Sequence, residues 1–211
     1  MTAAAALIEA ARALDALGFM PSKSGNLSVR TGRGYLITPA ALPYAETTAA
    51  DLVEVDLGGA VLAGHRRPSS EWRMHAAIYA ARPEAGAVVH THSPCATALA
   101  CARQGLPPFH YMIAVGGGGD IRCSGYATFG TEALAEACVA ALEGRRAALL
   151  ANHGAVAIGR TLAGARTLAM EVENLARQYL ALRAAGLAPV LLDEAELAAV
   201  FEQFDGYGRL G

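Results

Sequence analysis

The sequence has only four cysteines among 211 residues, and no two of them form a C-x-x-C pair. Small domains held together by disulfides have a much higher cysteine density, so the sequence does not belong to that class. A reduced, cytoplasmic protein is the simplest interpretation. The sequence also lacks a run of about 18 to 20 apolar residues, the length that a membrane-spanning helix needs. We therefore expect no membrane segment.

An excess of charge of one sign is missing as well, because the formal net charge at pH 7 is −2. Lysine and arginine are scattered along the chain, so no basic surface for nucleic acid is indicated. The apolar N-terminal stretch is interrupted by Glu9 and has no basic segment before it, which favours an amphipathic helix over a signal peptide. A hydrophobic content of 54% over this length is enough for one core, and we expect a single domain over residues 1–211.

Helical and strand patterns mix along the chain without the regular rhythm of a βαβ protein. Helices are expected at about 2–17, 70–81, 94–104, 131–142, 161–185 and 193–204. Strands are expected at 26–30 and 34–39 as a hairpin, at 51–63 as a second hairpin turning at Gly58-Gly59, at 85–92, and on both sides of a turn at His153-Gly154. We expect an α/β protein of the α+β type, with a central, mainly antiparallel sheet covered by helices. The run Gly116–Gly119 does not fit a phosphate-loop motif and is interpreted as a flexible loop.

Three histidines are the strongest chemical signal in the chain. His90 and His92 stand in V-V-H-T-H-S, so on an extended strand their imidazoles point to the same face. His153 stands in L-A-N-H-G, where the following glycine lets another backbone approach closely. Three protein ligands and one open position are typical of catalytic zinc, so the pattern favours a metal site over buried strand histidines. The weaker candidates are His65, His75 and His110, of which His110 is expected near a site.

Two short segments are candidates for binding an anion. In P-S-S-E-W-R, Ser69, Ser70 and Glu71 begin an expected helix whose free N–H groups suit a phosphate. From the spacing alone, an ordinary helix cap is the favoured interpretation of this segment. Ser24-Gly25-Asn26 is a turn of small residues before a strand, and its amides can form an anion-binding nest, although an ordinary turn is the default.

Taken together, several segments resemble the class II aldolase/adducin family and, within it, the L-fuculose-1-phosphate aldolase branch. The resemblance extends from about residue 10 to the tail. The matching segments are S-G-N-L-S-V-R, L-I-T-P, P-S-S-E-W-R-M-H, A-V-V-H-T-H, F-H-Y-M-I-A, Y-A-T-F-G-T and N-H-G. The resemblance implies the three-layer fold of class II aldolases and a homotetramer with sites between subunits.

The resemblance also implies a lyase that cleaves a ketose 1-phosphate, such as L-fuculose 1-phosphate, between C3 and C4. The products would be dihydroxyacetone phosphate and an aldehyde, L-lactaldehyde for that substrate. One Zn²⁺ per subunit, with Mn²⁺ or Co²⁺ as alternatives, would stabilise the enediolate that the cleavage leaves. A Schiff-base lysine is then not needed.

Roles for individual residues follow from the same resemblance. The metal ligands would be His90, His92, His153 and, in the resting enzyme, Glu71. Glu71 would then move away and act as the general acid/base, and Tyr111 of a neighbouring subunit would donate a proton. The phosphate ligands would be Gly25, Asn26, Ser69 and Ser70. Phe129 and Tyr207 would wall the aldehyde side.

The chain departs from the family pattern at two places near the expected phosphate site. Ala40-Ala41 stands where the family commonly has a hydroxyl residue and glycine, which removes one expected hydrogen bond. Lys23 stands where the fuculose-phosphate branch often has threonine. We hypothesise that Lys23 compensates as a point charge toward the phosphate or another substrate anion.

Other activities on the same scaffold stay open at this point. Pentose-phosphate epimerases typically carry aspartate where Glu71 stands, which argues against an epimerase. A dehydratase or a decarboxylase of a keto acid remains an alternative, because decarboxylation leaves the same kind of carbanion. A non-catalytic adducin-like binding module is disfavoured by the intact histidines and Glu71.

Overall fold

The structure is a computed structural model that describes residues 2–207, with side chains from 2 to 205. The strands are β1 (Asn26–Arg30), β2 (Tyr35–Ile37), β3 (Val53–Val55), β4 (Val61–Ala63), β5 (Ala87–Thr91), β6 (Arg122–Cys123), β7 (Ala147–Leu150) and β8 (Gly154–Gly159). They form one sheet in the order β4-β3-β2-β1-β5-β8-β7-β6. All neighbouring strands are antiparallel except β6 and β7, which confirms the predicted mainly antiparallel sheet.

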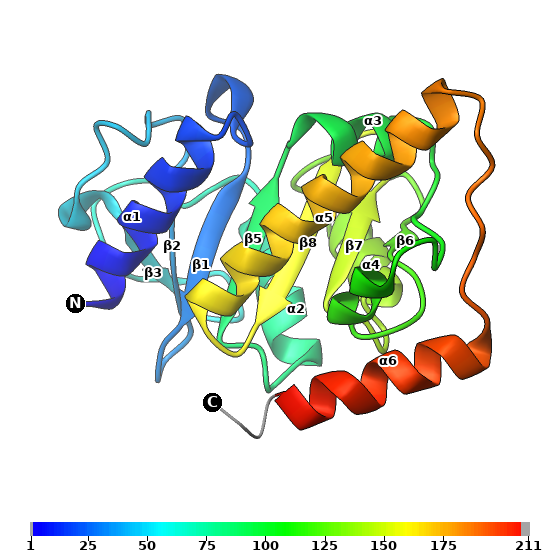
Figure 1. Ribbon diagram of the computed structural model, residues 1–211. Helices are drawn as coiled ribbons and strands as arrows, with labels where there is room; N and C mark the ends of the chain where they lie inside the picture. The colour runs from blue at the N-terminus through cyan, green and yellow to red at the C-terminus, as the bar shows by residue number, and fades with distance from the viewer. Residues whose placement is uncertain (1, 208–211) are drawn as a thin grey trace.

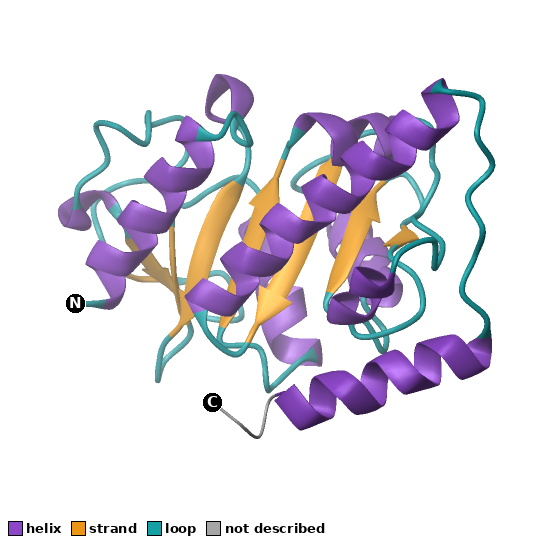
Figure 2. Ribbon diagram, viewed as in Figure 1, coloured by secondary structure: helices purple, strands orange, loops and turns teal. Residues whose placement is uncertain are grey.

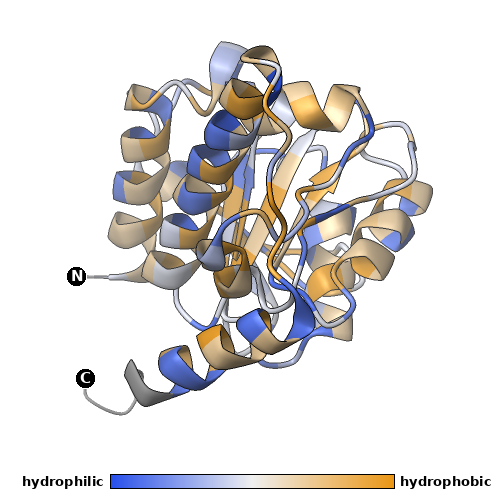
Figure 3. Cartoon of the chain, turned by 45° about the vertical axis from the view of Figure 1, so that its right-hand side comes forward, coloured by the Kyte–Doolittle hydropathy of each residue, from blue (hydrophilic) through white to orange (hydrophobic). Residues whose placement is uncertain are grey.

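Helices cover both faces of the sheet (Figures 1 and 2). The helices are α1 (Ala3–Ala16), α2 (Trp72–Ala81), α3 (Pro94–Cys101), α4 (Glu132–Ala141), α5 (Leu162–Ala184) and α6 (Glu194–Tyr207), with short 3-10 turns η1 (Pro21–Lys23), η2 (Ala49–Asp51) and η3 (Tyr111–Gly116). One apolar cluster joins α1, α3 and α5 to the sheet, and a second joins α2 and α4 to it. The result is the predicted three-layer arrangement, and Figure 3 shows mainly apolar strands between helices of mixed polarity.

The burial of β5 on both faces explains its continuous apolar sequence. Val89 packs in the cluster of α1, α3 and α5, whereas Val88 packs in the cluster of α2 and α4. Because side chains alternate along a strand, His90 lies on the same face as Val88, toward α2. In the sheet, His90 pairs with Asn26 of β1 and with Val156 of β8. The position of β5 at the centre of the sheet therefore places His90 near the N-terminal end of α2.

Some predicted boundaries were wrong, for local reasons. The helix expected from Ser70 begins at Trp72, because Glu71 has a non-helical backbone as its N-cap. The helix expected to reach Gln104 ends at Cys101, since Arg103 turns into the left-handed region. Gly116 was assigned to a flexible loop, but it is buried at the end of η3. No helix in the described part is both long and apolar enough to span a membrane.

Candidate metal centre and active site

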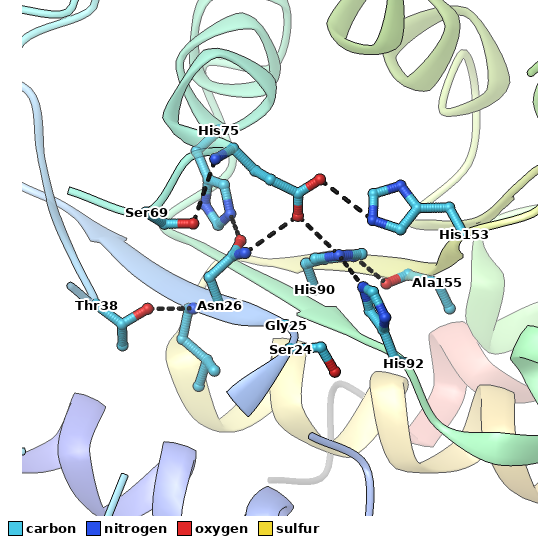
Figure 4. A network of polar contacts seen from close by, with 12 residues as sticks. Ser24, Gly25, Asn26, Thr38, Ser69, His75, His90, His92, His153 and Ala155 are labelled. Carbon is cyan, nitrogen blue, oxygen red and sulfur yellow. Dashed lines mark hydrogen bonds and ion pairs between the residues drawn. The ribbon is translucent and has the colours of Figure 1, made fainter. Parts of the chain in front are cut away.

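Three histidines, labelled in Figure 4, converge with one glutamate at one end of the central strands. His90 lies in β5 and His92 just after that strand. His153 lies in the turn before β8, and Glu71 precedes α2. Their ligand atoms all lie within 4.8 Å of one another. The predicted grouping of these four residues is therefore present in the structure, although they come from three separate parts of the chain.

The hydrogen-bond pattern of the cluster fits a cation. The Nδ1 of His90 lies 2.9 Å from the carbonyl oxygen of Ala155, so it carries the proton, and Nε2 then offers a lone pair. That lone pair faces a carboxylate oxygen of Glu71 at 2.8 Å and Nε2 of His92 at 3.0 Å. The other carboxylate oxygen of Glu71 lies 3.2 Å from Nε2 of His153. Converging lone pairs of this kind repel one another unless a cation neutralises them, and an imidazole and carboxylate set suits Zn²⁺.

Burial controls the protonation of the cluster. Burial and the neighbouring histidines lower the pKa of His92 to about 3 and that of His153 to about 4, so both are neutral at physiological pH. Burial alone would raise the pKa of Glu71, but His90, His153 and the Asn26 amide hold it below its ordinary value. Although burial of the His90 ring acts in the opposite direction, the Glu71 carboxylate in turn raises the pKa of His90. Neutral imidazoles and an ionised carboxylate are the forms that bind a metal.

Two turns without room for larger side chains give the cluster its shape. A Cβ on Gly154 would overlap the carbonyl oxygen of Thr91 and would press on the rings of His92 and His90. A Cβ on Gly25 would overlap Met20 and would lie 2.7 Å from the carbonyl oxygen of His90. Both glycines are therefore needed where the β1 and β8 segments pass β5.

A cavity of about 400 Å³ lies beside the cluster. The predicted anion-binding residues line it, namely Lys23, Gly25, Asn26, Ser69 and Ser70. Positive φ angles at Ser22, Lys23 and Gly25 curl the backbone in the manner of an anion-binding nest. The hydroxyl of Tyr44 donates to the carbonyl oxygen of Gly25 at 2.7 Å and holds this turn in place. Ala40-Ala41, the first departure from the family pattern, lines the same cavity.

The lining of the cavity also includes residues that sequence reasoning missed. Phe129, expected on the aldehyde side, lines the cavity and is 65% exposed, and Tyr126 and Asn152 line it too. Arg103 donates to the Asn152 amide oxygen at 2.9 Å and lies over the Tyr126 ring at 5.8 Å. Asn152 has a φ of 56°, which lies in the left-handed region that asparagine tolerates better than most residues. The asparagine of the N-H-G motif is therefore the sequence signal that could have indicated a turn at this position.

Other predicted residues lie away from the cavity of their own chain. Tyr111 is 53% exposed and stacks on Phe204 of α6, with ring centroids 6.4 Å apart. The side chain of Tyr207 lies outside the described residues. His110 accepts a hydrogen bond from the Met112 amide and caps η3, so it does not join the cluster. The exposed His65 lies 3.7 Å from Asp51, on the η2 side of the molecule.

Residues 5–180 match the family described as Class II Aldolase and Adducin N-terminal domain. The chain belongs to this family.

Named relatives of this class II aldolase chain are aldolases for sugar phosphates. A 5-methylthioribulose-1-phosphate/5-deoxyribulose-1-phosphate aldolase of Rhodospirillum rubrum is 51% identical, covering 96% of this chain and 90% of the relative. The L-fuculose phosphate aldolase of Escherichia coli is 44% identical over 96% of this chain and 94% of its own. A solved L-fuculose 1-phosphate aldolase superposes with a TM-score of 0.92 at 39% identity, covering 97% of this chain and 98% of that one. The protein is thus an enzyme of the class II aldolase type, a lyase.

Proposed function

We propose that this enzyme cleaves a ketose 1-phosphate into dihydroxyacetone phosphate and an aldehyde. The observation that carries the proposal is the His90, His92, His153 and Glu71 cluster beside a cavity lined by anion-binding groups. These four residues would hold the metal, which we take to be one Zn²⁺ per subunit. When bound, Zn²⁺ supplies Lewis-acid stabilisation of the negative charge that develops next to the substrate carbonyl.

The nest side of the cavity binds the phosphate in this proposal. Backbone amides at Gly25, the amide of Asn26 and the hydroxyls of Ser69 and Ser70 supply donors without a net charge. Lys23 adds a cation at the rim of the same cavity and compensates for Ala40-Ala41. Holding the phosphate there positions the distant C3–C4 bond at the metal cluster, since remote binding energy orients the reacting carbons.

Glu71 is placed to act as the general acid/base that transfers protons to and from the substrate. Its carboxylate contacts His90 and His153, and the residue lines the cavity while being only 4% exposed. A carboxylate that leaves a metal and the hydrogen bonds of a buried site becomes more basic, which suits a general base near neutral pH. We propose that Glu71 takes this role, and that Glu71→Gln retains phosphate binding while losing cleavage.

Two candidate substrates differ at the end that becomes the aldehyde. L-fuculose 1-phosphate is the first, and a 5-methylthio- or 5-deoxyribulose 1-phosphate is the second. The higher identity to the Rhodospirillum rubrum relative favours the second candidate, and so do the exposed rings of Tyr126 and Phe129 at the cavity wall. Aromatic rings suit an apolar methylthio group better than a hydroxylated chain.

The deciding experiment offers both substrates to the purified protein, with and without a chelator. Release of dihydroxyacetone phosphate is followed by coupled NADH oxidation. We expect chelator-sensitive release, with a higher kcat/KM for the substrate that fits the aromatic wall. Release that a chelator does not affect would contradict the metal role. Carbon dioxide from a keto acid, without aldehyde release from either sugar phosphate, would show a decarboxylase instead.

We also propose a cytoplasmic, single-domain subunit that works in a homotetramer, with Tyr111 completing the site of a neighbour and Tyr207 walling the aldehyde side. The exposed position of Tyr111, away from its own cavity, supports a role in another subunit. This role has a direct test by mixing two inactive variants, Tyr111→Phe and Glu71→Gln. In random cyclic tetramers, about a quarter of the sites combine an intact Glu71 with an intact Tyr111 of the next subunit. We expect activity to return to about that fraction of wild type, and mixed tetramers that stay inactive would contradict the role.

A further inference from the structure

Five polar side chains form a continuous chain of hydrogen bonds that leads from the metal cluster into the core. Asn26 Nδ2 lies 3.1 Å from Glu71 Oε2, and Asn26 Oδ1 lies 2.5 Å from His75 Nε2. His75 Nδ1 lies 2.6 Å from Ser28 Oγ, which lies 2.8 Å from the Tyr79 hydroxyl. All five residues are buried, and His75 and Ser28 are fully so. Figure 4 shows His75 against the Asn26 amide.

Two periodicities bring these residues together. Asn26 and Ser28 are two residues apart on β1, so they share one face of the sheet. Glu71, His75 and Tyr79 are four residues apart and therefore share one face of α2 and its N-terminus. The strand face and the helix face meet in register, which gives the sequence pattern N-x-S with E-x-x-x-H-x-x-x-Y.

Donors and acceptors can be assigned along the whole chain. The Glu71 carboxylate only accepts, so the Asn26 amide turns its NH₂ group to Glu71 and its oxygen to His75. His75 must then carry its proton on Nε2 in order to donate to that oxygen. Its Nδ1 accepts from Ser28, whose oxygen is left to accept from the hydroxyl of Tyr79.

The reverse assignment fails at both ends of the Asn26 amide. A flipped amide would set its oxygen against the Glu71 carboxylate, and an Nδ1–H tautomer of His75 would set a lone pair against the Asn26 oxygen. Burial lowers the pKa of His75 to about 3, so the ring is neutral and has one proton to place. Burial also raises the pKa of Tyr79, which keeps its hydroxyl a donor.

We propose that His75 is a positioning residue that fixes the orientation of the Asn26 amide. With this orientation, the NH₂ group faces Glu71 and the cavity, where it can donate to the carboxylate or to a bound phosphate. This inference rests on the proposed function for the phosphate role of Asn26, but the tautomer of His75 and the amide orientation do not depend on it. A flipped amide would present an oxygen to the anion and would repel it.

The tautomer is tested directly by solid-state ¹⁵N NMR of the full-length protein labelled at histidine, with His75→Gln to assign the signal. We expect Nε2 of His75 to be protonated and Nδ1 to be unprotonated, both in chelator-treated protein without metal and in zinc-loaded protein. A protonated Nδ1 overturns the proposal, whatever the enzyme cleaves. If the tautomer is as expected but no ketose 1-phosphate is cleaved, the proposed function fails and the orientation of Asn26 stands.

Three substitutions of His75 separate positioning from packing. His75→Gln can place an N–H near the position of Nε2, His75→Asn reaches only the position of Nδ1, and His75→Phe fills the space without any donor. We expect His75→Gln to stay within about threefold of wild type in affinity for inorganic phosphate, measured by calorimetry on zinc-loaded protein. His75→Asn and His75→Phe are expected to lose about tenfold or more, because the amide oxygen loses its donor.

The kinetic readout uses the same variants with the preferred ketose 1-phosphate. Loss of the Asn26 amide orientation is expected to raise KM in His75→Asn, whereas KM in His75→Gln is expected to stay near the wild-type value. Circular dichroism checks that each variant folds. Equal loss of phosphate affinity in the Gln and Asn variants would show that His75 only packs, and would overturn the proposal. If His75→Phe does not fold, the Gln and Asn pair and the tautomer measurement still decide the question.

Discussion

At the scale of single residues, Gly154 has a role that its place in the N-H-G motif only hints at. Its backbone passes so close to β5 that a methyl group would overlap the carbonyl oxygen of Thr91 and touch two of the three histidine rings. The glycine therefore sets the distance between His153 and the pair on β5. The shape of the metal cluster depends on this contact as much as on the ligands themselves.

We expect Gly154→Ala to weaken zinc affinity by about 10-fold to 100-fold, as changes next to metal ligands do, because the histidine rings must shift. The affinity is measured by competition with a chromogenic chelator. Gly32→Ala is the matched control, since a methyl group there meets no atom within 4 Å. Unchanged zinc affinity in the Gly154 variant would show that the turn tolerates the methyl group and that our account of the cluster is wrong.

At the scale of elements, α3 is held in place by a side chain from α5. Glu173 is 8% exposed and accepts hydrogen bonds from the amides of Cys95 at 2.9 Å and Ala96 at 2.8 Å. A carboxylate at a helix N-terminus satisfies free N–H groups and interacts favourably with the helix dipole. Because α3 begins two residues after His92, this cap also anchors one of the proposed metal ligands.

We expect Glu173→Ala to lower the free energy of unfolding by about 2 to 4 kcal/mol, because one buried and one half-buried amide lose a charged acceptor. Urea unfolding of the zinc-free protein measures the change without the metal contribution. Glu171→Ala, on the more exposed side of the same helix, is expected to cost about 0.5 kcal/mol or less. Equal effects of the two substitutions would contradict the capping role.

A second element-scale feature is the acid sensitivity of the turn η2. Asp51 pairs with Arg66 and accepts from the Thr48 hydroxyl at 2.7 Å and amide at 2.9 Å. The Arg66 hydrogen bond, with those from Thr48, lowers the pKa of Asp51 from its ordinary value of 3.8. A lowered folded pKa means that the stabilisation is complete above the unfolded pKa and is lost as the pH falls toward the folded pKa.

We therefore expect the urea midpoint of Asp51→Asn to lie below that of wild type at pH 6, and the difference to shrink below about pH 4. Unfolding at a series of pH values measures it, with the exposed Glu136→Gln as the control. A difference that stays constant from pH 6 to pH 2 would show that Asp51 acts by shape and not by charge.

At the scale of the whole molecule, the metal cluster joins distant parts of the chain. Glu71 immediately precedes α2, His90 lies in β5 at the centre of the sheet with His92 just after the strand, and His153 precedes β8. A bound metal would link these segments only in the folded state, so it stabilises the fold by mass action.

With free zinc at about a hundred times its dissociation constant, we expect a stabilisation of about 2.7 kcal/mol, or about 5 to 10 °C in melting temperature. Differential scanning calorimetry with zinc and with a chelator measures the shift. In His153→Ala the shift is expected to be much smaller, because one of four ligands is missing. A shift of equal size in this variant would indicate that zinc binds elsewhere.

Local periodicity in the sequence predicted most of the elements and placed His90 and His92 on one face of a strand, whereas Glu71 entered the predicted cluster through the family resemblance. The spacing of His90 and His92 on a strand, the turn at His153-Gly154 and the helix after Glu71 follow from backbone geometry over a few residues. The mainly antiparallel sheet followed from short hairpins without a βαβ rhythm. Exact helix ends were missed at Ser70 and Gln104, because single cap residues decide them.

Only the tertiary structure decided which distant residues meet. His75 is one of several histidines in the sequence, and its contact with Asn26, 49 positions away, depends on how α2 packs on β1. Tyr126 and Asn152 reach the cavity through loops whose course no local pattern specifies. The physical reason is range: hydrogen-bonding and side-chain preferences act over one or two turns of chain, whereas the pairing of a strand face with a helix face depends on packing of the whole core.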